Sequence, residues 1–146
     1  MYKKILIPLE NSPTDQVILD HIRPLGRMTK AQFTLVHVAD GYVARLQDQL
    51  NLEDSEEIKK DRAYLEKIKS RLTSDGFEVK TYLANGEPTD EILAIAEKEK
   101  CDLIAMSTHG HKFFKDILLG SVAEGIRHRT DIPILMIRAP EAQRSM

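Results

Sequence analysis

Short apolar runs alternate with amphipathic stretches along the chain, and this alternation predicts five strands separated by helices. Each strand candidate is an apolar or β-branched run that is too short to be a helix. The predicted strands lie at Lys4–Pro8, Gln32–Val38, Phe77–Leu83, Leu103–Met106 and Asp131–Arg138. In Phe77–Leu83 apolar and polar residues alternate, which indicates a half-exposed strand at or near a sheet edge.

The helices between these strands are predicted from apolar residues at three- and four-residue steps. The first helix begins with a capping box made by Ser12 and Asp15, and Pro13 suits its first position because the missing N–H is not needed there. We expect Pro24 to kink this helix or to end it early. The later helices are predicted at residues 55–74, 89–100 and 122–129.

The helix predicted at 55–74 has one row of residues that is expected to face the core, and most of its other residues are charged. The stripe consists of Ile58, Arg62, Leu65, Ile68 and Leu72. The charged residues from Glu56 to Asp61 are most simply a solvated face, and Gly76 is a natural C-terminal cap. Residues 40–54, which precede this helix, show a weaker pattern and are predicted to form an irregular or partly helical connection.

Strands that alternate with helices of this length favour a parallel sheet with right-handed crossovers and helices on both faces. The expected architecture is therefore a three-layer α/β/α fold of the Rossmann-like kind. In such sheets a ligand lies outside the carboxyl ends of the strands, at the point where the strand order reverses. The periodicity alone leaves the strand order open.

The length of 146 residues suits one domain, which we expect at residues 1–140 with a loose tail at 141–146. A net charge of −2 gives no general attraction to nucleic acid or to an anionic membrane. We find neither a secretory signal nor an apolar stretch long enough to span a bilayer. The single cysteine, Cys101, is interpreted as a packing residue. It cannot form an internal disulfide, which favours a cytoplasmic location.

A glycine-bearing segment follows the buried strand at Leu103–Met106 and carries the chemistry. Gly110 lets the backbone approach an anion closely, and Gly120 and Ser121 are expected to begin the next helix. Ser121 either serves as its N-cap or turns its hydroxyl toward a phosphate. The first turn of a helix favours anions, so this order predicts a phosphate site. The alternative is that the two glycines are ordinary turn and cap residues, because neither standard phosphate motif is present.

The same segment resembles the nucleotide-binding signature of the universal stress protein family, which is glycine, two residues, glycine, nine residues, glycine, then serine or threonine. Gly110, Gly120 and Ser121 match with the nine-residue spacing intact, whereas Ser107 stands where the ATP-binding members have glycine. The likeness covers nearly the whole chain. It includes Lys4–Pro8, Val36–Val38, Gly86–Pro88 and Ile132–Leu135.

The resemblance implies the strand order 3-2-1-4-5 of the adenine nucleotide alpha hydrolase-like fold. That order brings the residues after the first strand beside those after the fourth. Glu10 aligns with the family's usual aspartate, which contacts the nucleoside, and Val38 aligns with a position that lines the adenine. The implied site residues are Pro8, Leu9, Glu10, Val38, Met106, Ser107, His109, Gly110, Gly120, Ser121 and Val122.

Three functions are compatible with these residues. The leading hypothesis is a regulatory protein of the stress response that binds ATP or another adenine nucleotide, with Mg²⁺ or Mn²⁺ on the phosphate oxygens. The second is a slow ATPase or phosphotransferase using His109 or Glu10. The loop has no arginine or acidic pair to stabilise transferring charge, so we expect little or no turnover. The third is a dimeric interaction module without a ligand, which Ser107 favours.

Several charged side chains have an ordinary interpretation. His37, inside the second strand, is more typical of a core or sheet-edge residue than of a ligand-binding one. His109 and His111 resemble a metal pair, but no further ligand has suitable spacing, so we interpret them as loop histidines. Lys112 and Lys115 are either solvated, which charge patterning favours, or add positive charge near the phosphates.

The last strand predicts a partner. Residues Ile132 to Ile137 are mostly apolar, and an edge strand that is apolar on both faces is an aggregation hazard unless it is covered. Pairing with the same strand of a second subunit would cover it with two-fold symmetry. The common dimer of the resembled family is similar, so we expect a homodimer.

Overall fold

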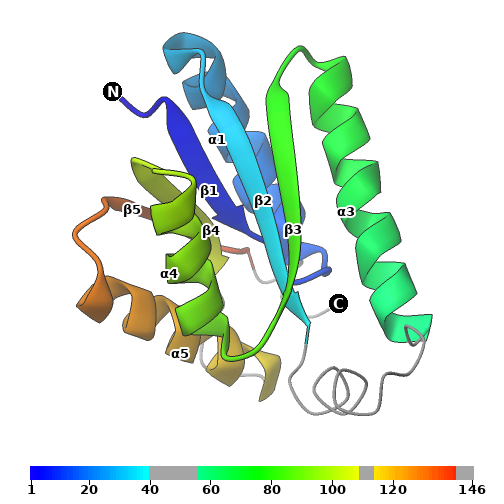
Figure 1. Ribbon diagram of the computed structural model, residues 1–146, viewed down its shortest axis with the longest axis vertical. Coiled ribbons are helices and arrows are strands. Elements are labelled where there is room, and N and C mark those ends of the chain that lie inside the picture. The colour runs from blue at the N-terminus through cyan, green and yellow to red at the C-terminus, as the bar shows by residue number, and fades with distance from the viewer. Residues whose placement is uncertain (40–55, 109–113, 141–146) are drawn as a thin grey trace.

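Five parallel strands form a single sheet in the order β3-β2-β1-β4-β5 (Figure 1). The computed structural model describes residues 1–39, 56–108 and 114–140. The strands are β1 (Lys4–Pro8), β2 (Gln32–Ala39), β3 (Glu78–Asn85), β4 (Leu103–Thr108) and β5 (Ile134–Arg138). The predicted strand order is confirmed, and β3 is an edge strand as its alternating pattern indicates.

Some of the sequence predictions fall outside the described residues. They are the irregular connection at 40–54, the tail at 141–146, and His109, Gly110, His111 and Lys112. The side chain of Lys115 is also not described.

The described helices cover both faces of the sheet. They are α1 (Thr14–Thr29), α3 (Glu56–Ser74), α4 (Pro88–Lys98) and α5 (Phe114–Arg129). Side chains of a strand point alternately to its two faces. In β1, Ile5 and Ile7 therefore pack with α1 and α3, whereas Leu6 packs with α4 and α5. This arrangement confirms the three-layer α/β/α fold.

Pro24 does not end α1, so the expectation of an early end was wrong. The helix continues through Pro24 to Thr29. Ile22 and Gly26, on either side of the proline, are both buried against the sheet. Burial of this face stabilises the last turns, and it outweighs the backbone hydrogen bond that proline cannot donate.

The helix expected at 122–129 also starts earlier, because α5 begins at Phe114. Gly120 and Ser121 consequently lie inside the helix, and the prediction that Ser121 caps it was wrong. No proline interrupts residues 114–119, and one interior glycine weakens a helix by only about 1 kcal/mol relative to alanine. Val122, Ala123 and Ile126 are buried against the sheet and hold the helix in place.

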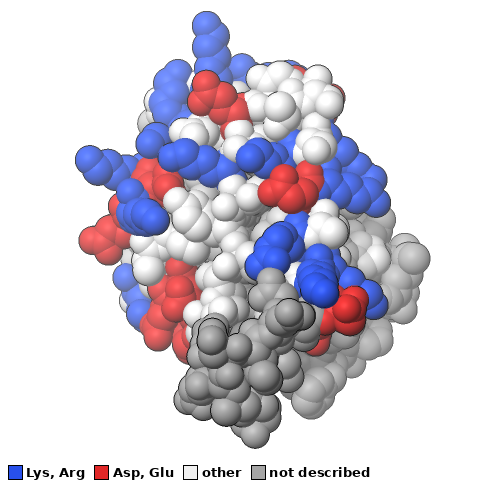
Figure 2. Space-filling model, turned by 45° about the vertical axis from the view of Figure 1, so that its right-hand side comes forward, with Lys and Arg blue, Asp and Glu red and all other residues white. Residues whose placement is uncertain are grey.

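The surface of the described residues carries charges of both signs. On the face seen in Figure 2, Lys and Arg side chains are interspersed with Asp and Glu. Within the described ranges, no helix combines the length and the apolar character that crossing a membrane requires.

Candidate functional site

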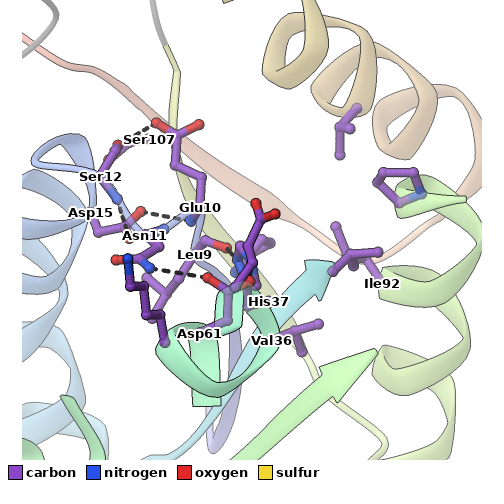
Figure 3. A pocket seen from close by; sticks show the side chains of 16 residues that line it. Leu9, Glu10, Asn11, Ser12, Asp15, Val36, His37, Asp61, Ile92 and Ser107 are labelled. Carbon is purple, nitrogen blue, oxygen red and sulfur yellow. Dashed lines mark hydrogen bonds and ion pairs between the residues drawn. The ribbon is translucent and has the colours of Figure 1, made fainter. Parts of the chain in front are cut away.

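A pocket of about 690 Å³ opens at the carboxyl ends of β1, β2 and β4 (Figure 3). It lies where the strand order reverses between β1 and β4, which is the place where parallel sheets bind ligands. The strand ends contribute Pro8, Val36, His37, Val38 and Ser107. The connection from β1 into α1 contributes Leu9, Glu10, Asn11 and Ser12, and the first turn of α1 contributes Asp15. The helices contribute Glu57, Lys60, Asp61, Pro88, Ile92 and Val122.

The structure brings six of the implied site residues together around this pocket. They are Pro8, Leu9, Glu10, Val38, Ser107 and Val122. Met106 does not line it, because its side chain is fully buried between the sheet and the helices α4 and α5. Ser121 is an exposed residue of α5 and is not among the lining residues. Gly120 lies in the same helix, whereas His109 and Gly110 are outside the described residues.

A buried carboxylate, Asp15, holds the connection between β1 and α1 in place. It accepts hydrogen bonds from the backbone N–H groups of Glu10 at 3.0 Å, Asn11 at 2.9 Å and Ser12 at 3.3 Å, and from the hydroxyl of Tyr64 at 2.6 Å. Asn11 has a positive φ of 62°, which asparagine tolerates better than most residues. Asp15, in the first turn of α1, therefore fixes the connection that precedes the helix, and Pro13 stands at the N-cap rather than in the first turn.

Burial and these hydrogen bonds act in opposite directions on the pKa of the Asp15 carboxyl. Asp15 is only 3% exposed, and burial raises the pKa of its carboxyl although the bonds from Tyr64 and Glu10 act to lower it. Burial also raises the pKa of the Tyr64 hydroxyl, and the neighbouring charge of Asp15 raises it further. Tyr64 is thus kept protonated as a donor to the carboxylate. The loop that carries Glu10 is thus fixed by a buried carboxylate that itself binds a half-buried hydroxyl.

The two departures from the family signature, Ser107 and Glu10, meet at Thr14. One oxygen of the Glu10 carboxylate accepts hydrogen bonds from the hydroxyls of Ser12 at 2.5 Å and Thr14 at 2.6 Å. The hydroxyl of Ser107, which is 4% exposed, donates to the backbone carbonyl of Thr14 at 2.8 Å. The end of β4 is therefore tied to the first turn of α1, and Glu10 faces the same turn.

His37, Asp61 and Asn11 form a second polar group on the pocket wall, which sequence reasoning missed. His37 Nδ1 lies 2.8 Å from the carbonyl oxygen of Leu9, and Nε2 lies 3.2 Å from a carboxylate oxygen of Asp61. The side-chain amide of Asn11 donates to the other oxygen of Asp61 at 3.0 Å. These side chains point toward one another at the pocket rim (Figure 3).

Asp61 is buried, so the prediction that it belongs to a solvated face was wrong. Arg62, predicted in the inward stripe, is exposed. The signal was present in the spacing: Asp61 lies three residues after Ile58 and four before Leu65, which are both buried. An acid on an apolar stripe was the sign of a polar partner within the protein.

The walls of the pocket differ in character. Val36, Val38, Ile92 and Val122 form an apolar side that suits a planar base, and a volume of 300–1,000 Å³ is typical of small-molecule sites. The opposite side carries carboxylate and hydroxyl oxygens of Glu10 and Ser12, which are ligands that hard cations accept. In the described part of the chain, no three His, Cys, Asp or Glu residues are grouped to hold a metal.

Comparison with known proteins gives one consistent family. The family model described as Universal stress protein family matches residues 1–138. Universal stress protein MJ0577 of Methanocaldococcus jannaschii is 33% identical, over 94% of this chain and 96% of that protein. The solved structure of MJ0577 superposes with a TM-score of 0.79, covering 96% of this chain and 98% of that chain.

Two further solved structures share the fold at lower identity. One is a universal stress protein in complex with cAMP, which is 17% identical with a TM-score of 0.70 and covers 95% of this chain and 98% of that chain. The other is the universal stress protein from Archaeoglobus fulgidus in complex with dAMP, which is 20% identical with a TM-score of 0.69 and covers 93% of this chain and 98% of that chain. Both similarities concern the arrangement of the backbone.

Proposed function

Because the chain belongs to the universal stress protein family, we propose that it is a regulatory protein that binds an adenine nucleotide with little or no turnover. The observation that carries this proposal is the pocket of about 690 Å³ at the reversal of strand order, lined by six of the implied site residues. The two structures in complex with cAMP and dAMP support adenine nucleotides as the ligand class. ATP is the ligand to test first, and a stress-related role in the cytoplasm belongs to the same proposal.

The proposed orientation of the nucleotide follows from the apolar and the polar side of the pocket. The base lies against Val38 and Ile92, and the sugar lies near Glu10. Ser107 marks the direction of the phosphates, because the signature continues from it to Gly110, Gly120 and Ser121. Mg²⁺ or Mn²⁺ would accompany a polyphosphate and take most of its ligands from phosphate oxygens and water.

Two measurements test this proposal. Denaturing the purified protein should release an adenine nucleotide, and titration of ATP and AMP into the nucleotide-free protein should give saturable binding. Val38→Phe fills the apolar wall and is expected to weaken binding at least about tenfold. Val38→Ile, which keeps the aliphatic character, serves as the matched control and should stay within about threefold of the parent. Absence of both released and titratable nucleotide would contradict the proposal.

A competing function has one observation in its favour. The hydroxyl of Ser107 donates to Thr14 and closes the position where ATP-binding members have glycine. An interaction module that works without a ligand is consistent with this closed position. The same titrations separate the two functions, because an interaction module shows no saturable binding of any adenine nucleotide.

We also propose a homodimer formed through β5. This strand is the sheet edge beside β4, and Ile134, Leu135 and Ile137 are only partly buried in the single chain. Met136, at the centre of the strand, is 38% exposed. Pairing of two β5 strands would cover these side chains and give hydrogen-bond partners to the backbone N–H and C=O groups along the strand edge.

A further inference from the structure

The imidazole of His37 stands between two acceptors at the end of β2. Its Nδ1 is 2.8 Å from the carbonyl oxygen of Leu9, and its Nε2 is 3.2 Å from a carboxylate oxygen of Asp61. A carbonyl oxygen and a carboxylate accept hydrogen bonds and donate none. Both contacts are therefore favourable only when both ring nitrogens carry a proton, so this geometry fits the imidazolium form.

Asp61 connects three elements around the pocket. It belongs to α3, its contact with His37 reaches the end of β2, and its second oxygen accepts from Asn11 in the connection between β1 and α1. The side chains of His37 and Asp61 are 12% and 11% exposed, so solvent screens this pair less than a surface ion pair. One carboxylate thus sets the spacing between the loop that carries Glu10 and the strand end that carries Val38.

We propose that Asp61 is a positioning residue that makes nucleotide binding at this pocket depend on pH through its contact with His37. This inference rests on the proposed function. With both ring protons present, the pocket wall is held in the form that the ligand needs, which reduces the ordering required on binding. When the ring loses a proton and keeps its bond to Leu9, the Nε2 lone pair faces the carboxylate of Asp61. The contact then becomes repulsive, and α3 loses this one link to the strand end while its buried residues keep it packed on the sheet.

Other charged groups lie close to this contact. Glu57 and Lys60 of α3 line the same pocket, as do Glu10 of the connection between β1 and α1 and Asp15 in the first turn of α1. Among the described residues on the other sides, Leu83 is the partner of His37 in β3 and Ile92 faces the pocket from α4, and both are apolar. A pH response of the site therefore requires variants that distinguish the Asp61 contact from these carboxylates.

The first test measures the affinity for cAMP from about pH 5 to about pH 8.5, the range in which histidine ordinarily changes charge. This probe is a phosphodiester whose own charge is constant over this pH range. Any change of its affinity with pH therefore comes from titration of groups in the protein. The parent is expected to bind about fivefold more weakly at the upper end. Asp61→Asn and His37→Gln should remove most of this slope. Glu66→Gln, which deletes an exposed acid on the same helix, should retain it.

A second test needs no ligand. The unfolding temperatures of the parent, Asp61→Asn, His37→Gln and the double variant form a double-mutant cycle. At about pH 6 the unfolding temperature of the double variant should fall by less than the sum of the two single decreases. At about pH 8.5 the decreases should be additive. An additive cycle at the lower pH, or a parent-like pH slope of cAMP binding in Asp61→Asn, overturns the inference. A coupled cycle in a protein that binds no adenine nucleotide at any pH contradicts the proposed function instead, and the contact stands without a binding role.

Discussion

At the scale of single residues, the proposed function predicts that Ser107 limits how closely a phosphate can approach β4. Ser107→Gly removes the hydroxyl that donates to Thr14 and opens the position next to the described end of the strand. The carbonyl of Thr14, which is buried, then loses this donor, so the free energy of unfolding should fall by about 1–2 kcal/mol. The affinity for ATP should rise, because the backbone is free of a side chain at the first signature position.

The control for this prediction is Ser107→Ala, which removes the same hydrogen bond but keeps a side chain. Calorimetric titration and chemical unfolding of both variants separate the two effects. The stability loss should be shared, and the gain in ATP affinity should belong to the glycine variant. Equal affinities for the two variants and the parent would show that Ser107 does not limit access to the phosphate end.

A second residue-scale prediction concerns Glu99, which lies away from the pocket. The hydrogen bond from Tyr82, followed by that from Lys80, holds the pKa of Glu99 below its ordinary value. A carboxylate with a lowered folded pKa stabilises the fold above its ordinary pKa, and this stabilisation is lost as the pH falls through the folded pKa. Tyr82→Phe should therefore lower the free energy of unfolding by about 1 kcal/mol at neutral pH and by less in acid.

Urea unfolding of the parent and Tyr82→Phe at about pH 7 and about pH 3 measures this difference. The phenylalanine keeps the aromatic ring over which the Lys98 ammonium lies, at 5.3 Å from the ring centroid, so the comparison isolates the hydroxyl. A loss of the same size at both pH values would mean that the bond to Glu99 does not contribute to the pH dependence.

At the scale of elements, close packing of α1 on β2 depends on Gly26. A Cβ at this position would lie 2.5 Å from Cζ of Phe33, whose ring also contacts Phe77 at a centroid distance of 4.7 Å. Gly26→Ala should lower the free energy of unfolding by about 1–3 kcal/mol, although alanine ordinarily favours a helix. Met28→Ala, on the exposed side of α1, should change it by less than about 0.5 kcal/mol in the same thermal or urea unfolding measurement.

The hydrophobic pattern predicted every strand of this sheet, because runs such as Ile5 to Ile7 are too short for helices and too apolar for loops. The pattern placed the start of α5 wrongly. A glycine followed by serine is a common helix start, yet Gly120 and Ser121 lie in the helix because buried residues after them hold it and nothing before them breaks it. Local capping signals cannot report such tertiary packing.

Prediction of the candidate site from the sequence is limited in the same way, because local patterns do not report tertiary contacts. The likeness to the family pointed to Glu10, Val38 and Ser107, which line the pocket, because these positions lie at or next to strand ends that the pattern predicts. Asp61 was missed because its partners, His37 and Asn11, are distant in the sequence and approach it only in the folded chain. A buried acid on an apolar helical stripe signals that a partner exists, but the spacing along one helix does not identify it.

At the scale of the whole molecule, the two edges of the sheet differ. Exposed charged and polar side chains of β3, among them Glu78 and Lys80, protect its edge, whereas β5 presents Met136 between partly buried aliphatic residues. Light scattering at micromolar concentration should therefore give twice the mass of the chain. Met136→Lys introduces a charge at the proposed two-fold contact and should shift the mass toward the monomer, because unpaired charges are costly to bury.

An exposed methionine on another element supplies the control for this prediction. Met28 is 82% exposed on α1, so Met28→Lys adds the same charge outside β5 and should leave the dimer intact. The lysine at position 136 should be tolerated by the single chain, since that side chain is already 38% exposed. A folded Met136→Lys variant that stays dimeric would place the interface elsewhere, and a parent that is monomeric would exclude a β5 dimer at that concentration.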